Sequence, residues 1–221
     1  DAARAAGLDP ARDLILALAR GHPPEQSLMV SSGLEALPLL GSACDARDGA
    51  HLCEDLAIVE VLDPRTGRAC GHGERGNLVV TVLEKDNFLL RYDLEDIVRL
   101  NTKPCPCGET HRRLFYEGRV RDVVTVAGHD VLPIDVALVL YDFPEVSTPS
   151  AEYQVVRGAA PRDALHVRME YDPTGGVDAA ALTRRLAEAF QARLGVRAAL
   201  ELVARGAVPR FAYKAARVVD A

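Results

Sequence analysis

Two cysteines separated by a single residue, Cys105 and Cys107, are the side chains in this sequence best suited to specific chemistry. The segment 105–108 contains a proline and ends in a glycine, which favours a tight turn that presents both thiols. The spacing is too short to suit a disulfide between the two, and the five cysteines are an odd number. Cys44 and His51 lie upstream. Soft thiolates with one imidazole suit tetrahedral zinc.

The residue types therefore predict a structural zinc site with the ligands Cys44, His51, Cys105 and Cys107. A closed set of four protein ligands leaves no open position, and catalysis at zinc requires one. His111 is the substitute ligand if His51 points away. The alternative is that these are reduced thiols that happen to lie near turns, because the long gap between the two halves does not fix a ligand set.

The glycine pattern at 71–76 matches the dinucleotide fingerprint letter for letter. That fingerprint works only where a strand precedes it and a helix follows, so that phosphate meets a helix N-terminus. Here the following residues, from Asn77, have the pattern of a strand. We therefore interpret 71–76 as a turn.

Length and composition limit the class of protein. The chain has 221 residues, 48% of them hydrophobic, which allows one good-sized core or two modest ones. Its longest apolar stretches fall short of the roughly 20 residues that span a bilayer, and 1–7 lacks the pattern of a secretory signal. The net charge of −6 excludes the basic field that nucleic-acid binding requires. The expectation is a cytoplasmic protein that binds neither membrane nor nucleic acid.

The secondary structure expected around these residues changes along the chain, from a helix near the start to strands, and then to a mixture of strands and helices. Helical spacing over 11–20 ends at a Gly and two prolines, whereas the pattern from Ala57 is that of short antiparallel strands. After Gly118 the order is strand (123–126), helix (134–141), two strands (153–156 and 164–169), helix (178–194) and strand (198–203).

This order predicts an α+β fold with a domain boundary near Gly118. Residues 1–117 would form a β-rich part, a distorted antiparallel barrel, and 118–221 a βαββαβ ferredoxin-like domain with both helices on one face of an antiparallel sheet. In the second helix, Leu182, Leu186 and Phe190 recur every fourth residue, Asp178 can cap its start and Gly195 can end it.

Several segments also match motifs of a known family. In chain order they are 47–55, after the family's Tyr-Gly-x-Ser/Thr-Glu motif; 61–78, its hairpin and Gly-Glu-x-Gly-Glu-Leu strand; 91–96, its Arg-Tyr-x-Thr-x-Asp motif; 105–108, a Cys-x-Cys-Gly segment; 118–133, its hinge and first lid strand; and 209–214, its Pro-Arg-x-x-Gly-Lys motif. Together they resemble the phenylacetate–coenzyme A ligase branch of the adenylate-forming superfamily.

The resemblance implies an activity and a set of roles. Such enzymes activate a carboxylate with ATP to an acyl-adenylate, and a thiol then displaces AMP while a C-terminal lid swings between the two steps. By the resemblance, Glu35 would hold Mg²⁺, Asp96 the ribose hydroxyls and Arg119 the nucleotide. Lys214, carried by the lid, would offset charge on the reacting oxygens, and Asp122 would be the hinge.

The motifs also depart from the family pattern. Residues 31–35 lack the aromatic and the hydroxyl expected before Glu35, Leu94 replaces a threonine, and Ala127 stands where an arginine is usual. No segment resembles the superfamily's Ser/Thr/Gly-rich phosphate loop. We therefore expect at most half of an active site here, and no turnover by this chain alone.

Two interpretations from different classes follow. The first is a ligase, as a fragment or as one part of a split enzyme, whose site a companion polypeptide or a missing N-terminal half completes. A homodimer that buries exposed core surface is a further expectation. Its acceptor would be coenzyme A or a carrier-protein thiol, and its acid is left open. The second is a truncated, non-catalytic relative that acts as a binding or scaffold module.

Overall fold

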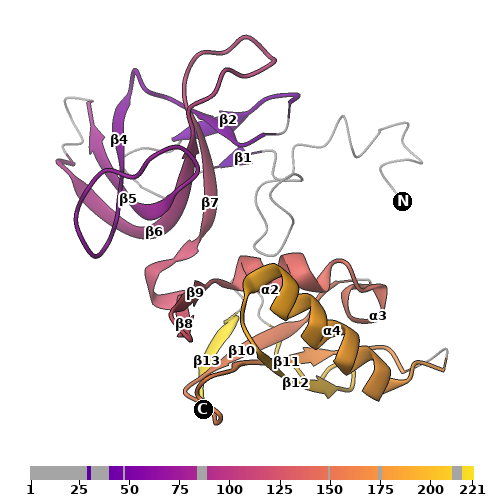
Figure 1. Ribbon diagram of the computed structural model, residues 1–221. Helices are drawn as coiled ribbons and strands as arrows, with labels where there is room; N and C mark the ends of the chain where they lie inside the picture. Colours follow the sequence, from indigo (N-terminus) through magenta and orange to yellow (C-terminus); the bar gives the residue numbers. More distant parts are fainter. Residues whose placement is uncertain are drawn as a thin grey trace, which may run out of the picture. The chain divides into compact units, whose positions relative to one another are not determined.

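The computed structural model describes residues 29–30, 40–46, 48–83, 89–148, 150–173, 176–210 and 216–221. The expected helix over 11–20 lies outside these residues. The chain divides into two compact units, Asp1–Glu117 and Gly118–Ala221 (Figure 1). Each unit has its own hydrophobic core.

The first unit is built on one curled half-barrel sheet, in agreement with the predicted β-rich part. Its strands are ordered β1-β2-β3-β7-β6-β5-β4, and the pairs β1–β2, β2–β3, β3–β7, β4–β5 and β5–β6 are antiparallel. The strands are β1 (Met29–Val30), β2 (Gly41–Ala43), β3 (Ala50–Leu52), β4 (Ala57–Leu62), β5 (Arg75–Val82), β6 (Tyr92–Asn101) and β7 (Arg113–Arg119). β3 is thus the neighbour of β7, far from it in sequence.

The sequence explains the β4–β5 part of this sheet. In β4, buried Ala57, Val59 and Val61 alternate with more exposed residues, which is the period of a half-buried strand. Asp63 accepts hydrogen bonds at Oδ1 from the amides of the two turn residues that follow Pro64. The 71–76 segment is a turn that leads into β5, as expected, and not a nucleotide-binding loop before a helix.

The second unit begins with a short 3-10 turn and a separate hairpin. The turn η2 (Val120–Asp122) is followed by β8 (Val124–Val126) and β9 (His129–Val131), which pair with each other. Ala127 and Gly128, between the strands, have φ of 49° and 83°. Positive φ at both central residues is typical of a two-residue hairpin whose twist matches that of its strands.

A mixed four-stranded sheet forms the body of the second unit, with the order β12-β11-β10-β13. Its strands are β10 (Tyr153–Arg157), β11 (Leu165–Glu170), β12 (Ala198–Val203) and β13 (Val218–Asp220). β10 and β11 are antiparallel, whereas β13 runs parallel to β10 and β12 parallel to β11. The predicted antiparallel sheet is therefore wrong. The expected first strand, at 123–126, pairs in the hairpin, and β13 takes the place beside β10.

Both longer helices lie on one face of this sheet, as the sequence predicts (Figure 1). They are α2 (Pro133–Leu140) and α4 (Ala179–Leu194), with a short α3 (Pro144–Ser147) after α2. In α4, the Asp178 carboxylate accepts from the amides of the first turn, and Gly195 ends the helix at φ 70°. The apolar face of α4 packs into the core with Leu182, Leu186 and Phe190, each at most 1% exposed.

No helix among the described residues is long and apolar enough to cross a membrane. The five cysteines, all of them described, form no disulfide. The fold is therefore a mixed α/β arrangement in which the first unit brings Cys44, His51 and the 105–107 segment to one end of its sheet.

Candidate functional site

The four residues expected to bind zinc lie together. The ligand atoms of Cys44, His51, Cys105 and Cys107 are all within 4.8 Å of one another. Cys44 follows β2, His51 lies in β3, and the two remaining cysteines lie in the loop that joins β6 to β7. Because β3 is hydrogen-bonded to both β2 and β7, the sheet itself brings the two halves of the cluster into contact.

The spacing of the atoms fits a tetrahedral ion. Zn–S bonds of about 2.3 Å and Zn–N bonds of about 2.05 Å at tetrahedral angles place two sulfurs about 3.8 Å apart and a sulfur and nitrogen about 3.6 Å apart. The Sγ atoms of Cys44 and Cys105 are 3.7 Å apart, and Cys107 Sγ lies 3.4 Å from His51 Nε2. The donor set of three thiols and one imidazole thus fits a structural zinc ion in both chemistry and size.

His51 is held in the orientation that a metal ligand needs. It is 7% exposed, and its Nδ1 donates to the carbonyl of His111 at 3.1 Å, which leaves the Nε2 lone pair facing the sulfurs. A second partner of this kind fixes both tautomer and ring plane in metal sites. The substitute ligand, His111, is not among the clustered residues, and its Nδ1 donates to the carbonyl of Leu52 at 2.8 Å.

Hydrogen bonds from Arg113 and Asn101 hold the loops around this cluster in place. Arg113, which pairs with His51 across the sheet, is 1% exposed. Its guanidinium donates to the carboxylate and carbonyl of Asp48 on one side and to the carbonyl of Lys103 at 2.8 Å on the other. Asn101 adds a bond of 3.1 Å to Asp48. The loop with Cys44 and the loop with Cys105 are therefore joined by a buried cation.

The environment favours a thiolate at Cys105, whereas burial raises the pKa of the Cys44 thiol. Chiefly a hydrogen bond from the backbone amide of Cys107 lowers the pKa of the Cys105 thiol to about 7. Metal binding requires the deprotonated form. Cys105 is thus partly ionised near neutral pH before any cation is considered.

The residues expected to bind nucleotide are described in part. Asp96 lies in β6 of the first unit, and Arg119 ends β7; both are half-buried. Asp122 is the last residue of η2, immediately after the division between the units. Glu35 and Lys214 lie outside the described residues. The structure therefore does not test the proposed roles of these five residues.

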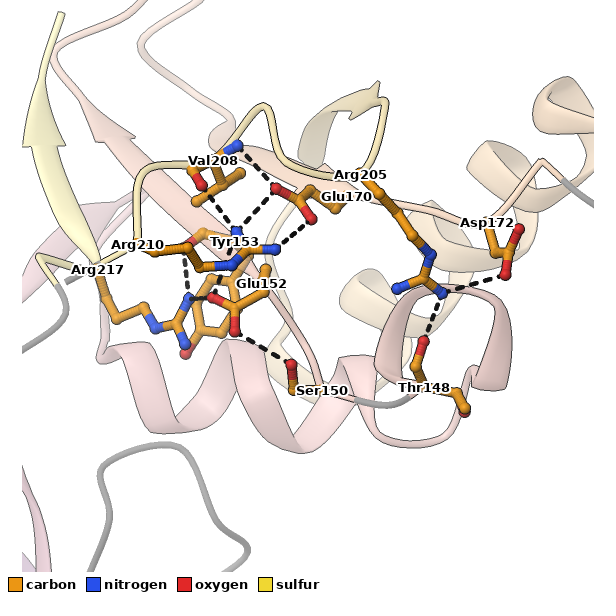
Figure 2. A network of polar contacts seen from close by, with 10 residues as sticks. All are labelled: Thr148, Ser150, Glu152, Tyr153, Glu170, Asp172, Arg205, Val208, Arg210 and Arg217. Atoms are coloured by element: carbon orange, nitrogen blue, oxygen red, sulfur yellow. Dashed lines mark hydrogen bonds and ion pairs between the residues drawn. The ribbon is translucent and has the colours of Figure 1, made fainter. Parts of the chain in front are cut away.

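Sequence reasoning missed an ion-pair network in the second unit, in which Arg210 and Arg217 meet two acidic residues (Figure 2). Glu170, 3% exposed, accepts two hydrogen bonds from Arg210, and Glu152 accepts from Arg217 at 3.1 Å. The one sequence signal was an acidic residue at the end of a strand, where it would usually be solvated. The pairing itself depends on contacts distant in sequence.

Comparisons with known proteins agree with the resemblance. Residues 128–221 match the family model of the AMP-binding enzyme C-terminal domain. The phenylacetate-coenzyme A ligase of Thermus thermophilus is 37% identical over 137 residues, which is 60% of this chain and 30% of that protein. The enzyme of the same name from Aromatoleum evansii is 29% identical over 192 residues, 83% of this chain and 42% of that protein.

The fold comparison points the same way. A crystal structure of 2-hydroxyisobutyryl-CoA ligase in the postadenylation state, bound to an acyl-AMP, matches with a TM-score of 0.69 and 31% identity. That match covers 82% of this chain and 39% of the ligase. The chain thus spans less than half the length of the relatives it matches. It belongs to the adenylate-forming superfamily, within the phenylacetate–coenzyme A ligase-like group.

Proposed function

We propose that this chain contributes the C-terminal part of an AMP-forming acid–thiol ligase. The observation that carries the proposal is the 31% identity, over 82% of the chain, to a ligase whose structure contains an acyl-adenylate. In the reaction, a carboxylate oxygen attacks the α-phosphorus of ATP and pyrophosphate leaves. The sulfur of a thiol then attacks the acyl carbon, and AMP leaves with the bonding electrons.

The residues of this chain would act mainly by charge and position. Asp96 would accept hydrogen bonds from the ribose hydroxyls, and Arg119 would donate to the nucleotide. Glu35 would hold Mg²⁺ through oxygen, the ligand atom that this cation prefers. Lys214 would offset the negative charge that develops on the α-phosphate in the transition state.

The second unit would be the lid of this enzyme, and the first unit the C-terminal part of its larger domain. Asp122 would be the hinge. Its place in a short turn, between β7 and the β8–β9 hairpin, is consistent with a residue at an element boundary that absorbs a change in backbone angles. We place the enzyme in the cytoplasm, with a carboxylic acid as substrate and coenzyme A or a carrier-protein thiol as acceptor.

Carboxylate-dependent exchange of labelled pyrophosphate into ATP tests this function. The assay is run on the complete protein, and on this chain with and without candidate companion polypeptides, over a panel of aryl, arylacetic and aliphatic acids. Exchange that disappears in Lys214→Ala and persists in Arg184→Ala, a change on an exposed helix face, supports the ligase. Silence with every acid and companion argues instead for a binding or scaffold module.

We also propose that Cys44, His51, Cys105 and Cys107 bind one structural zinc ion. The distances within the cluster, the Nδ1 contact of His51 and the closed set of four ligands support a role in holding the β2–β3 end of the sheet to the loop before β7. No position would remain for a substrate, so the metal would act on stability and not on chemistry.

Metal analysis of the purified protein tests the zinc site directly. We expect about one zinc ion for each chain, and its loss in Cys105→Ser and His51→Ala. Cys53→Ser is the matched control, because Cys53 is adjacent to β3 but is not part of the cluster. A folded protein without zinc after preparation in zinc-containing medium would end this proposal.

A further inference from the structure

Strand β6 of the first unit contains a β-bulge. Its register with β5 shifts between the pair of Asn77 with Ile97 and the pair of Val79 with Asp93. One residue separates these positions on β5, whereas three residues, 94–96, separate them on β6. β6 therefore accommodates more chain than its partner at this point. Bulges redirect side chains and are over-represented beside active sites.

The bulge contains an unusual backbone conformation at Glu95. Its φ is 56°, in the left-handed region that is costly for most residues other than glycine. The amide of Glu95 donates to Oδ1 of Asp93 at 2.8 Å, the local turn that an aspartate forms with the backbone two residues on. Nδ2 of Asn77 donates to Oδ2 of Asp93 at 3.4 Å. The carboxylate of Asp93 thus holds the turn closed and connects it to β5.

The surrounding structure fixes the chain on the near side of the bulge and within it. At the start of β6, the amide of Arg91 donates to Oγ1 of Thr81 at 3.0 Å, and its guanidinium forms a bidentate pair with Glu60 at 3.0 and 3.2 Å. Leu94 packs against the core of the first unit. A strained backbone persists only where its surroundings impose it, and such residues cluster at functional sites.

We propose that Asp93 and Glu95 are positioning residues for Asp96. The inference rests on the proposed ligase function, in which Asp96 accepts hydrogen bonds from the ribose hydroxyls. Because Asp96 follows Glu95 directly, the left-handed turn at Glu95 sets where the Asp96 carboxylate leaves the backbone. A binding group must be held within about 0.5 Å of its productive place, so the bulge would decide whether this carboxylate meets the hydroxyls.

Two substitutions of Glu95 separate its backbone conformation from its side chain. Glu95→Gly and Glu95→Val both remove the carboxylate, but glycine adopts a positive φ readily and a β-branched residue does not. Asp93→Ala removes the acceptor for the Glu95 amide, whereas Asp93→Asn keeps one. We expect Glu95→Val and Asp93→Ala to displace Asp96, and the other two variants to leave it in place.

The readout is the ratio of two dissociation constants, that of 2′,3′-dideoxy-ATP to that of ATP, measured by titration calorimetry on the complete protein. This ratio reports on the ribose hydroxyls, so a general loss of stability does not change it. Hydrogen bonds to a charged group predict a wild-type ratio of about ten to a hundred. It should fall below about three in Glu95→Val and Asp93→Ala, and stay within about twofold of wild type in Glu95→Gly and Asp93→Asn.

Asp63→Ala is the matched control. Oδ1 of Asp63 also accepts from a backbone amide two residues on, that of Arg65 at 2.7 Å, in an exposed turn of the first unit. Its ratio should be that of the wild type. A fall in Asp63→Ala as large as that in Asp93→Ala, or an unchanged ratio in Glu95→Val, would overturn the positioning role.

Crystal structures of the variants test the positioning role without any nucleotide. The Asp96 carboxylate should move relative to β5 by more than about 1 Å in Glu95→Val and by less than about 0.5 Å in Glu95→Gly. An unmoved carboxylate in Glu95→Val would refute the positioning role even if the protein is an active ligase. Equal binding of the two nucleotides by the wild type, with the carboxylate displaced in Glu95→Val, would refute the ribose contact alone.

Discussion

The ion pair between Glu170 and Arg210 should make the stability of the second unit depend on pH. Its hydrogen bonds, first of all those from Arg210, lower the pKa of the Glu170 carboxyl from an ordinary 4.5 to about 2. At about 1.4 kcal/mol per unit this corresponds to roughly 3 kcal/mol. Because the Arg210 side chain is 52% exposed, solvent screening reduces the expected contribution to about 1–2 kcal/mol.

The sign follows from the direction of the shift. A carboxyl whose pKa is lower in the folded than in the unfolded state stabilises the fold fully above the unfolded value, and this contribution is lost as pH falls through the folded value. The window for Glu170 therefore runs from about pH 4.5 down to about pH 2. In Glu170→Gln the contribution is absent at every pH, so wild type and variant should converge in acid.

Hydrogen exchange of the α4 amides is the suitable assay, because it reports on the second unit alone. After correction for intrinsic rates, the slowest α4 amides in Glu170→Gln should exchange about five- to thirtyfold faster than in wild type at pH 7. Asp172→Asn, which removes the ion pair of Asp172 with Arg205 at 3.3 Å, serves as control. A difference that stays constant from pH 7 to pH 2, or no difference at pH 7, would refute the reasoning.

Three further predictions concern the α4 helix, each measured by thermal unfolding and by exchange of its amides. Asp178→Ala removes the cap bonds of 2.9 and 3.2 Å and should cost about 1 kcal/mol, a fall in Tm of about 4–8 °C for a unit of this size, whereas Asp178→Asn should restore most of it. Leu186→Ala empties a fully buried site and should cost about 2–5 kcal/mol, against less than about 0.5 for the exposed Arg184→Ala. Gly195→Ala places a Cβ at φ 70° and should cost about 1–2 kcal/mol; an unchanged Tm would contradict the cap geometry.

Local signals predicted the elements with strong periodicity and clear ends. Strand β4 begins at Ala57, where the strand pattern begins, β12 has the expected bounds, 198–203, and α4 starts and ends at the predicted cap residues. The sequence did not reveal which strands pair. The 123–126 strand is followed by a two-residue turn with Gly128, which closes a local hairpin before that strand can join the sheet. The short β13 carries too little pattern for recognition.

The candidate metal site was predictable by chemistry and not by spacing. Three thiols and an imidazole are soft ligands wherever they occur, so their types were enough to suggest zinc. Only the contact of β3 with β7 brings His51 to Cys107, and that contact joins residues far apart in the sequence. The choice of His51 over His111 likewise depended on position in the fold, because the ring of His51 in β3 lies among the three sulfurs.

The acidic pair at the end of β10 and β11, Glu152 and Glu170, adds little net stability to the fold for the charge that it buries. Buried ion pairs are weak evidence for stability, because well-packed apolar side chains often do as well. Glu170 and Glu152 also lie side by side, so each adds repulsion that the arginines must offset. Apolar contacts, however, are non-directional and would not fix the course of the backbone. The bidentate pair of Arg210 and the contacts of Arg217 do fix it, at residues 208–210 and at the start of β13. Position, more than stability, is therefore the property that these two acids supply.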